Sequence, residues 1–305
     1  MGTFAGHALP GSFFLLFGIW SAIFQLRKYY RRKRFELGFT SVPVEVYRNQ
    51  MTTPCPCPGS SCCSTRKLPL DSIIKATCCA IGIIGEVYTG FNGGKFVYIG
   101  NAQHATMFSM FLLSGVFEIL NFYRILRLPP ASDYFATFLA ITTEGILFVF
   151  HLHGRTPADI YVHTILIYAV LLTIAVGTYE AVNLRSHIAG LLRSILIILQ
   201  GTWFWHVGAI LYPPVSWLPV WDELAVESIP RAANVFCQHV LLVFACVLLT
   251  ATVMGYGLRN PPARLKGDQP DSCISSDQQR LLDSDEISDD EETELLEMRT
   301  WKPLK

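Results

Sequence analysis

The stretch EGILFVFHLHGR, residues 144–155, combines an apolar run with side chains that can bind a metal ion or a proton. Glu144 and His151 are seven residues apart, so in a helix they share one face, separated by about 10 Å along the axis. At that separation they cannot both bind one ion. His151 and His153 would point in nearly opposite directions on a continuous helix, so one would be a ligand and the other would support it.

The other histidines of the chain follow the same pattern. Seven of the eight fall near one end of the expected membrane spans, although the basic loops alone set the orientation. Imidazole and carboxylate groups at matched depth are typical ligands of zinc or iron. The alternative is that they are structural residues, hydrogen-bonded to nearby loops. The candidate metal ligands are His7, His104, His151, His153, His163 and His239, and the candidate catalytic groups are Glu86 and Glu144.

The elements that must position these groups are membrane helices. The chain has 305 residues, of which 51% are hydrophobic and only 16% are charged, a composition too apolar for a disordered protein. A bilayer core of roughly 30 Å requires about 20 apolar residues per helix. We therefore expect an all-α, polytopic membrane protein with seven transmembrane helices, at 9–26, 72–91, 104–123, 134–152, 161–183, 188–212 and 235–257.

Basic segments follow every second expected span: RKYYRRKRF, YRILR, NLRSH with Arg193, and RNPPARLK. Basic loops face the cytosol, which predicts a lumenal or extracellular N-terminus and a cytosolic C-terminus. Residues 1–257 then form a transmembrane domain with a basic, Cys/Pro-rich cytosolic loop at 27–71. Residues 258–305 form an acidic cytosolic tail that is too charged to bury a core and is predicted to be disordered. The expected partner is the lipid bilayer, with no nucleic acid.

Two further carboxylates, Glu118 and Glu180, lie toward the cytosolic ends of their spans. The favoured prediction is a salt bridge for each, and the alternative is the inner end of an ion or proton path that leads through Glu144 to the histidines. Gln200 needs an internal partner, because the bilayer core offers no water. The expected salt-bridge partners are Arg124, Arg127 and Arg185.

Several ordered motifs carry a family resemblance: GHALPGSFFL at 6–15, GE at 85–86, QHATMF at 103–108, EGILFVFHLHGR at 144–155, SILIILQGTWFW at 194–205, YPP at 212–214 and CQHV at 237–240. Together they resemble the transmembrane protein 45 family. The resemblance implies a seven-helix membrane protein of the endosomal and trans-Golgi system, in a family without an established biochemical activity. The chain departs from the family pattern in a Cys/Pro insert at 54–67 and in His206, where the family has glutamine. His206 is therefore the weakest candidate ligand.

The cluster CPCPGSSCC lies in the cytosolic loop beside basic residues. Disulfides are not expected in a reducing compartment. A juxtamembrane cysteine cluster of this kind predicts palmitoylation, and an unmodified loop is the alternative. The candidate lipidation sites are Cys55, Cys57, Cys62 and Cys63.

The tail contains DQQRLL and EETELL, each with an acidic residue four positions before a Leu-Leu pair. Such pairs resemble acidic dileucine signals, which clathrin adaptor complexes recognise and which direct proteins to endosomes and lysosomes. The candidate sorting residues are Asp277, Leu281 and Leu282 in the first pair and Glu291, Leu295 and Leu296 in the second.

The general expectation is a multi-pass protein of the endosomal or trans-Golgi system with a lumenal His/Glu layer and an unassigned activity. One specific alternative is a metal-dependent membrane hydrolase on a lipid-like substrate, with Glu86 or Glu144 as general base. A second is an ion- or proton-coupled transporter that uses the same groups. A third is a non-enzymatic trafficking or signalling adaptor whose histidines sense an acidic lumen. Whether the protein is an enzyme stays open.

Overall fold

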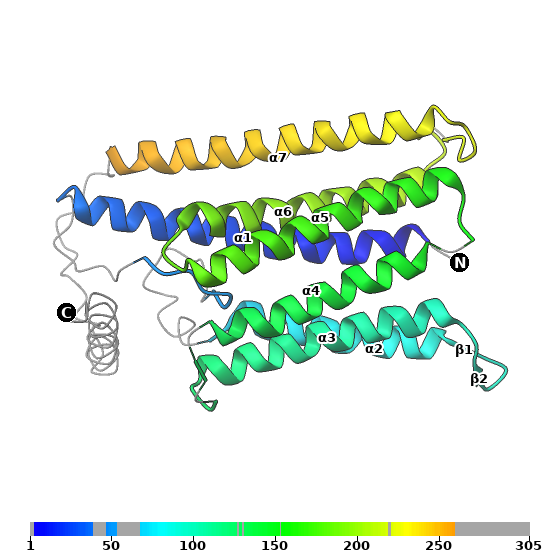
Figure 1. Ribbon diagram of the computed structural model, residues 1–305, viewed down its shortest axis with the longest axis horizontal. Coiled ribbons are helices and arrows are strands. Elements are labelled where there is room, and N and C mark those ends of the chain that lie inside the picture. Colours follow the sequence, from blue (N-terminus) through cyan, green and yellow to red (C-terminus); the bar gives the residue numbers. More distant parts are fainter. Residues whose placement is uncertain are drawn as a thin grey trace, which may run out of the picture. The chain divides into compact units, whose positions relative to one another are not determined.

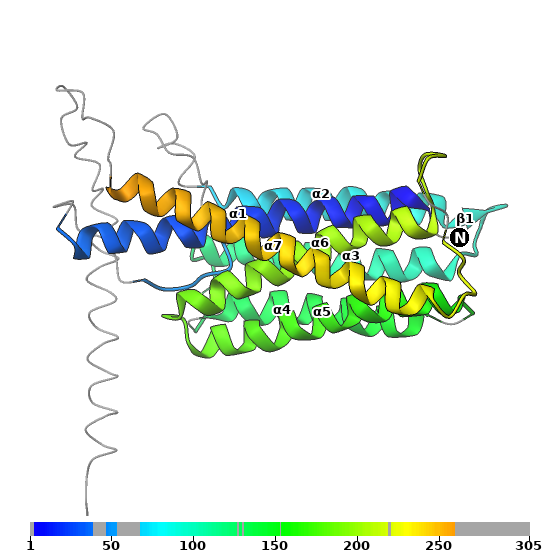
Figure 2. The same cartoon turned by 90° about the horizontal axis from the view of Figure 1, so that it is seen from above.

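The computed structural model describes residues 3–38, 47–53, 68–126, 128–129, 131–152, 154–218 and 221–259. Residues 1–259 belong to one compact unit. Seven α-helices and one short hairpin make up its described part (Figures 1 and 2). The elements are α1 (Phe4–Glu36), α2 (Leu70–Thr89), β1 (Phe91–Asn92), β2 (Lys95–Phe96), α3 (Ile99–Phe122), α4 (Ser132–His151), α5 (Pro157–Val182), α6 (His187–Leu211) and α7 (Ser228–Arg259).

A helix occupies each of the seven windows predicted from hydropathy, so the all-α prediction is confirmed apart from the two-residue strands. Helices suit this composition because every backbone hydrogen bond closes within the segment, as lipid requires. Within the described residues, six helices are long and apolar enough to cross a membrane. The exception is α2, which contains Asp71, Lys75 and Glu86. The ends of α1 and α7 were underestimated: both helices extend several residues beyond the apolar windows 9–26 and 235–257.

The closest helix pair is α1 and α6, which pack through glycines. A Cβ atom on Gly201 would lie 2.6 Å from the backbone nitrogen of Leu15, and one on Gly18 would lie 2.7 Å from Cγ1 of Ile198. Small residues let helix backbones approach in membranes, where lipid removes the usual hydrophobic drive for association. Ser21 and Ser194 add a 2.8 Å hydrogen bond across the same interface. These contacts keep α1 against α6 rather than against α2.

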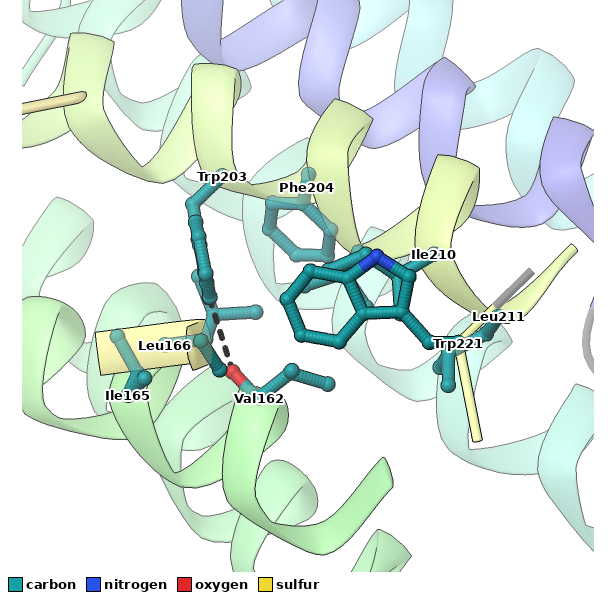
Figure 3. Close-up of a cluster of buried hydrophobic side chains, with 10 residues drawn as sticks. Val162, Ile165, Leu166, Trp203, Phe204, Ile210, Leu211 and Trp221 are labelled. Atoms are coloured by element: carbon teal, nitrogen blue, oxygen red, sulfur yellow. Dashed lines mark hydrogen bonds between the residues drawn. The ribbon is translucent and has the colours of Figure 1, made fainter. Parts of the chain in front are cut away.

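The helices form two groups (Figure 1). One contains α1, α5, α6 and α7, and the other contains α2, α3 and α4. The contact between α4 and α5 joins the two groups. Between α5 and α6 lies a core cluster around Trp203, which is fully buried and donates its indole N–H to the carbonyl of Val162 at 2.9 Å (Figure 3). This core holds α5 and α6 in register. Many α7 side chains remain exposed, as expected of a helix that faces lipid.

The start of α1, the β1–β2 hairpin and the α4–α5 loop lie at one end of the bundle (Figure 1). The hairpin pairs Phe91 with Phe96 and turns at Gly93 and Gly94, whose positive φ angles of 58° and 77° favour glycine. We call this the N-terminal end. Four of the candidate histidines lie there, His7, His104, His151 and His163. The predicted lumenal location of this end stays a prediction.

Candidate functional site

A cavity of about 490 Å³ opens at the N-terminal end of the bundle. Residues from five helices line it, namely Glu86 of α2, His7 of α1, His104 of α3, His151 of α4 and His163 of α5. We call it the histidine cavity. Four of the six histidines that the sequence suggested as ligands therefore meet around one space, although they are far apart in the chain.

The four imidazoles form a row across the cavity. The Nε2 atoms of His7 and His163 are 3.5 Å apart. Ring centroids are 6.4 Å apart for His163 and His151, and 5.7 Å apart for His151 and His104. His104 Nδ1 ends the row 3.1 Å from Oε1 of Glu86. Each imidazole thus lies next to one or two others in the row, and the four rings do not surround one point.

The local sequence RTPAD positions His163 and Arg155. Thr156 caps α5 by accepting a hydrogen bond from the backbone N–H of Asp159, and Pro157 occupies the first turn, where its missing N–H costs nothing. One turn later, His163 Nδ1 lies 2.8 Å from Oδ1 of Asp159, whose Oδ2 is 2.7 Å from Arg155 Nη1. Because Nδ1 faces Asp159, the Nε2 atom of His163 is left to face His7. Sequence reasoning missed Arg155 and Asp159, although their i, i+4 spacing was a detectable signal.

Both candidate catalytic carboxylates are placed, in different surroundings. Glu86 lines the histidine cavity, where Asn101 Nδ2 donates to its Oε2 at 2.8 Å and His104 contacts its Oε1. Glu144 is fully buried, and neither of its carboxylate oxygens has a hydrogen-bond partner among the described residues. An unpartnered polar group inside a protein needs an explanation.

The face of α4 explains the position of Glu144. Thr137 and Ile141 line a second cavity deeper in the bundle, whereas Phe148 and His151 line the histidine cavity. Glu144 lies on the same helical face, midway between these two pairs. Pro10 of α1 and Phe108 of α3 line both cavities, which are therefore adjacent.

The deeper cavity has a volume of about 150 Å³ and aromatic walls, so we call it the aromatic cavity. Its walls come from Phe13, Phe17 and Trp20 of α1 and from Phe108 and Phe111 of α3. Its charged lining residues are Asp71, Lys75, Glu118 and Arg193.

The predicted salt bridges of both inner carboxylates are present, but their partners among the described residues are not Arg124 or Arg185, and Arg127 lies outside the described residues. Glu118 pairs with Lys75 of α2 at 2.5 Å and accepts hydrogen bonds from Ser72 and Thr137. Glu180 pairs with Arg193 at 2.5 Å. The predicted span 188–212 contained Arg193, which was counted with the preceding basic segment NLRSH, and α6 carries it, 3% exposed, into the bundle. Hydropathy does not show that Arg193 is paired with Glu180 of another helix, because this pairing depends on how the helices pack. The internal partner predicted for Gln200 is confirmed, since its Nε2 donates to Thr173 Oγ1 at 2.7 Å.

Residues 47–53 cross the opposite end of the bundle. Asn49 Nδ2 donates to the Ser186 carbonyl at 2.8 Å, and the backbone N–H of Met51 donates to Asp133 Oδ2 at 3.0 Å. The Thr53 N–H donates to Asp71 Oδ2 at 2.6 Å. Met51 and Thr53 also line the aromatic cavity, so this segment separates the cavity from the space beyond.

Tyr47 begins this segment and donates its hydroxyl to Gln25 Oε1 at 2.6 Å. Burial of the phenol, with a smaller effect from the Glu180 carboxylate, raises the pKa of Tyr47. The hydroxyl therefore remains a neutral hydrogen-bond donor near neutral pH.

The structure does not bring His239 to the histidine cavity. Its Nε2 lies 3.3 Å from Nδ1 of His206, and the ring of Trp203 stacks on His206. His239 and His206 thus form a separate pair between α6 and α7. His153, the four candidate cysteines and the six candidate sorting residues lie outside the described residues.

The donor geometry does not fit a closed metal site. Across the described ranges, no three His, Cys, Asp or Glu side chains are grouped so that they could hold one ion. A zinc site takes three or four ligands around one point, whereas the imidazoles here are arranged in a row. The predicted zinc or iron site stays a prediction.

Comparison with known proteins relates the chain to membrane proteins. Residues 132–253 match a family described as "Family of unknown function (DUF716)". Transmembrane epididymal protein 1A of Mus musculus is 24% identical over 259 residues, which are 81% of this chain and 79% of that protein. Transmembrane epididymal protein 1 of Rattus norvegicus is 27% identical over 154 residues, 50% of each chain. Transmembrane epididymal protein 1 of Homo sapiens is 28% identical over 148 residues, 48% of this chain and 54% of that protein.

The chain thus spans about half the length of the rat and human relatives and most of the mouse one. Together with the six long apolar helices, these similarities support a multi-pass membrane protein that is related to a family of unknown function.

Proposed function

We propose that this protein conducts protons across its membrane, with Glu144 as the central proton-binding group. One observation carries the proposal: the Glu144 side chain is fully buried on the α4 face between the two cavities, and no described residue makes a hydrogen bond to it. Ionisable residues inside membrane spans are costly and commonly mark ion or proton pathways. A structural carboxylate would be paired, as Glu118 and Glu180 are.

The histidine row supports an entry route. A neutral imidazole has one donor and one acceptor nitrogen, so it can take up a proton on one side and release one on the other. His7 and His163 are close enough to pass a proton directly or with a small movement of one ring. His151 lies about 10 Å along the helix axis from Glu144, so water must bridge the two groups during transfer.

The inner ion pairs support an exit route. Glu118, its partner Lys75 and the hydroxyl of Thr137 lie beyond Glu144, around the aromatic cavity. The hydroxyl of Thr137, seven residues from Glu144 on the same face of α4, can relay a proton between a carboxyl group and water. The proposed route therefore runs from the histidine cavity to Glu144 and then to Glu118 at the aromatic cavity. The Glu118 side chain is 3% exposed, so its exchange with bulk water depends on opening at the end that residues 47–53 cover.

Proton uptake into liposomes tests the proposal. The purified chain is reconstituted with an enclosed pH-sensitive dye, and a potassium diffusion potential drives proton entry. We expect the wild type to acidify the interior faster than empty liposomes do, and Glu144→Gln to reduce the protein-dependent rate by about tenfold or more. Gln has the same size but carries no exchangeable acid proton.

Glu227→Gln is the matched control, because Glu227 is exposed in the described α6–α7 loop. Its proton uptake should equal that of the wild type. Wild-type liposomes that acidify no faster than empty ones would overturn the proposal, and so would a Glu144→Gln variant with full uptake.

We also propose the finer cellular assignments. The motifs at 6–15, 103–108 and 144–155 favour the transmembrane protein 45 family. The two acidic dileucine pairs favour recognition by clathrin adaptors and residence in endosomes, lysosomes or the trans-Golgi network. An acidic lumen on the histidine side would supply the proton gradient. The cysteine cluster at 55–63 favours palmitoylation next to the membrane.

A further inference from the structure

The aromatic cavity contains two polar groups that nothing in the described residues satisfies. Oε1 of Gln200 and Nε1 of Trp20 are buried, and neither has a hydrogen-bond partner. Gln200 itself is 1% exposed, and both residues line the cavity. Buried polar atoms in proteins are almost always paired, so an acceptor and a donor left open beside a cavity point to a ligand.

The hydrogen bonds around Gln200 define which of its atoms is open. Its Nε2 donates to Thr173 Oγ1 at 2.7 Å, and the Thr173 hydroxyl donates to the Ala169 carbonyl at 2.8 Å. Because the Thr173 proton is already used, the hydroxyl oxygen can only accept, and the Gln200 NH2 group must face it. Oε1 is therefore the free atom, and it requires a donor.

The charged lining residues are all paired within the protein. Lys75 pairs with Glu118, and Arg193 pairs with Glu180. Asp71 accepts hydrogen bonds from Thr53 and from the Ser72 N–H. A charged ligand would find no free counterion, and its burial would be costly. The ligand should be neutral.

The walls of the aromatic cavity indicate the size and polarity of the ligand next to its polar group. Phenylalanine rings from α1 and α3 surround a volume of about 150 Å³, and an apolar protein cavity of that size has room for roughly one six-membered hydrocarbon ring. The α1 and α2 walls belong to helices that do not pack along each other within the described part of the chain. A molecule dissolved in the bilayer can enter between them.

We propose that the aromatic cavity binds the hydroxyl end of a neutral, membrane-soluble alcohol that enters from the bilayer between α1 and α2. The ligand hydroxyl donates its proton to Gln200 Oε1. Its oxygen accepts a hydrogen bond from Trp20 Nε1. The hydrocarbon next to the hydroxyl packs against the aromatic walls, and the remaining chain lies in lipid. This site lies in the same cavity as the proposed proton exit route, but it is argued from Gln200 and Trp20, which the proposed function does not use.

Photolabelling of the full chain in detergent micelles tests this assignment. The probe is hexadecanol with a photoactivatable diazirine near its hydroxyl end, and the labelled peptides are identified by mass spectrometry. We expect labels on the cavity-facing parts of α1, α3 or α6. Unlabelled hexadecanol should compete about three- to tenfold better than hexadecane, the factor that one hydrogen bond contributes.

Gln200→Leu should abolish the preference for hexadecanol over hexadecane, whereas Gln238→Leu should keep it. Gln238 is exposed on α7 and provides the same substitution away from the cavity. Cys79→Phe, which adds a ring at a cavity wall, should reduce labelling itself. Comparison of melting temperatures identifies any variant that has lost its fold. The competition between hexadecane and hexadecanol is measured on the wild type, so it does not depend on a variant folding.

Three results would overturn the assignment. They are labels confined to the lipid-facing side of α7, equal competition by hexadecane and hexadecanol on the wild type, and stronger competition by hexadecanoate than by hexadecanol. The last result would indicate a charged ligand. None of them depends on proton flux, so this inference and the proposed function can fail separately.

Discussion

His7 of α1 and His163 of α5 face each other with their Nε2 atoms 3.5 Å apart, although 156 residues separate them in the chain. Asp159 binds the opposite ring nitrogen of His163 and so directs Nε2 toward His7. This contact joins the first turns of α1 and α5 at the N-terminal end of the bundle. His163 also neighbours His151, with ring centroids 6.4 Å apart, so it belongs to two of the contacts in the row. Its substitution should therefore interrupt the proposed proton pathway.

We therefore expect His163→Gln to slow proton uptake in the liposome assay by about tenfold or more. Glutamine preserves a polar side chain of similar length but cannot pick up a proton. His239→Gln is the matched control, because His239 pairs with His206 outside the cavity. Equal rates for the two variants would show that the histidine row is not the entry route.

The Glu180–Arg193 pair should dominate the stability of the inner half of the bundle. Both side chains are almost completely buried, and Tyr134 also donates to Glu180 at 2.9 Å. Glu180→Gln leaves the guanidinium without a counterion, which should cost about 3–5 kcal/mol of unfolding free energy. The measurement is thermal or denaturant unfolding in detergent micelles.

Two comparisons sharpen this prediction. Glu36→Gln changes an exposed carboxylate near the end of α1 and should leave stability nearly unchanged. The double variant Glu180→Gln, Arg193→Met should recover part of the loss, because the unpaired charge is gone. A single Glu180→Gln variant as stable as the wild type would contradict the assignment.

Glycines of the α1–α6 interface should differ sharply from glycines that face open space. Gly201→Ala places a Cβ 2.6 Å from the Leu15 backbone, so the helices must separate, at a cost of about 1–3 kcal/mol. At Gly85 of α2 an added Cβ meets nothing within 4 Å, and Gly85→Ala should stabilise the helix by about 0.5–1 kcal/mol. Unfolding of the two variants measures the difference, and changes of the same sign would argue against this packing.

Sorting by the acidic tail is tested in cells. Replacing Leu281, Leu282, Leu295 and Leu296 by alanine should shift a fluorescently tagged chain from internal compartments to the cell surface. Ser275→Ala together with Ser276→Ala changes the tail outside both dileucine pairs and should leave the distribution as it is. If the four-leucine variant keeps the wild-type distribution, the dileucine pairs are not the signals.

Hydropathy alone determined the approximate positions of the helices, because a membrane span requires a continuous apolar run and lipid admits few other structures. The sequence also suggested a histidine-rich end and an internal partner for Gln200. In these cases the signal is local: one run of residues, or one polar group in apolar surroundings.

Tertiary structure alone decided which groups meet. It joined His7, His104, His151 and His163 in one row and placed His239 in a separate pair with His206. It also paired Glu118 with Lys75 and Glu180 with Arg193. Within the ranges that the structure describes, it also gave Glu144 no hydrogen-bond partner. Depth along a helix can be counted from residue spacing, but the rotation of each helix and the choice of its neighbours depend on packing between distant segments, such as the glycine contacts of α1 with α6.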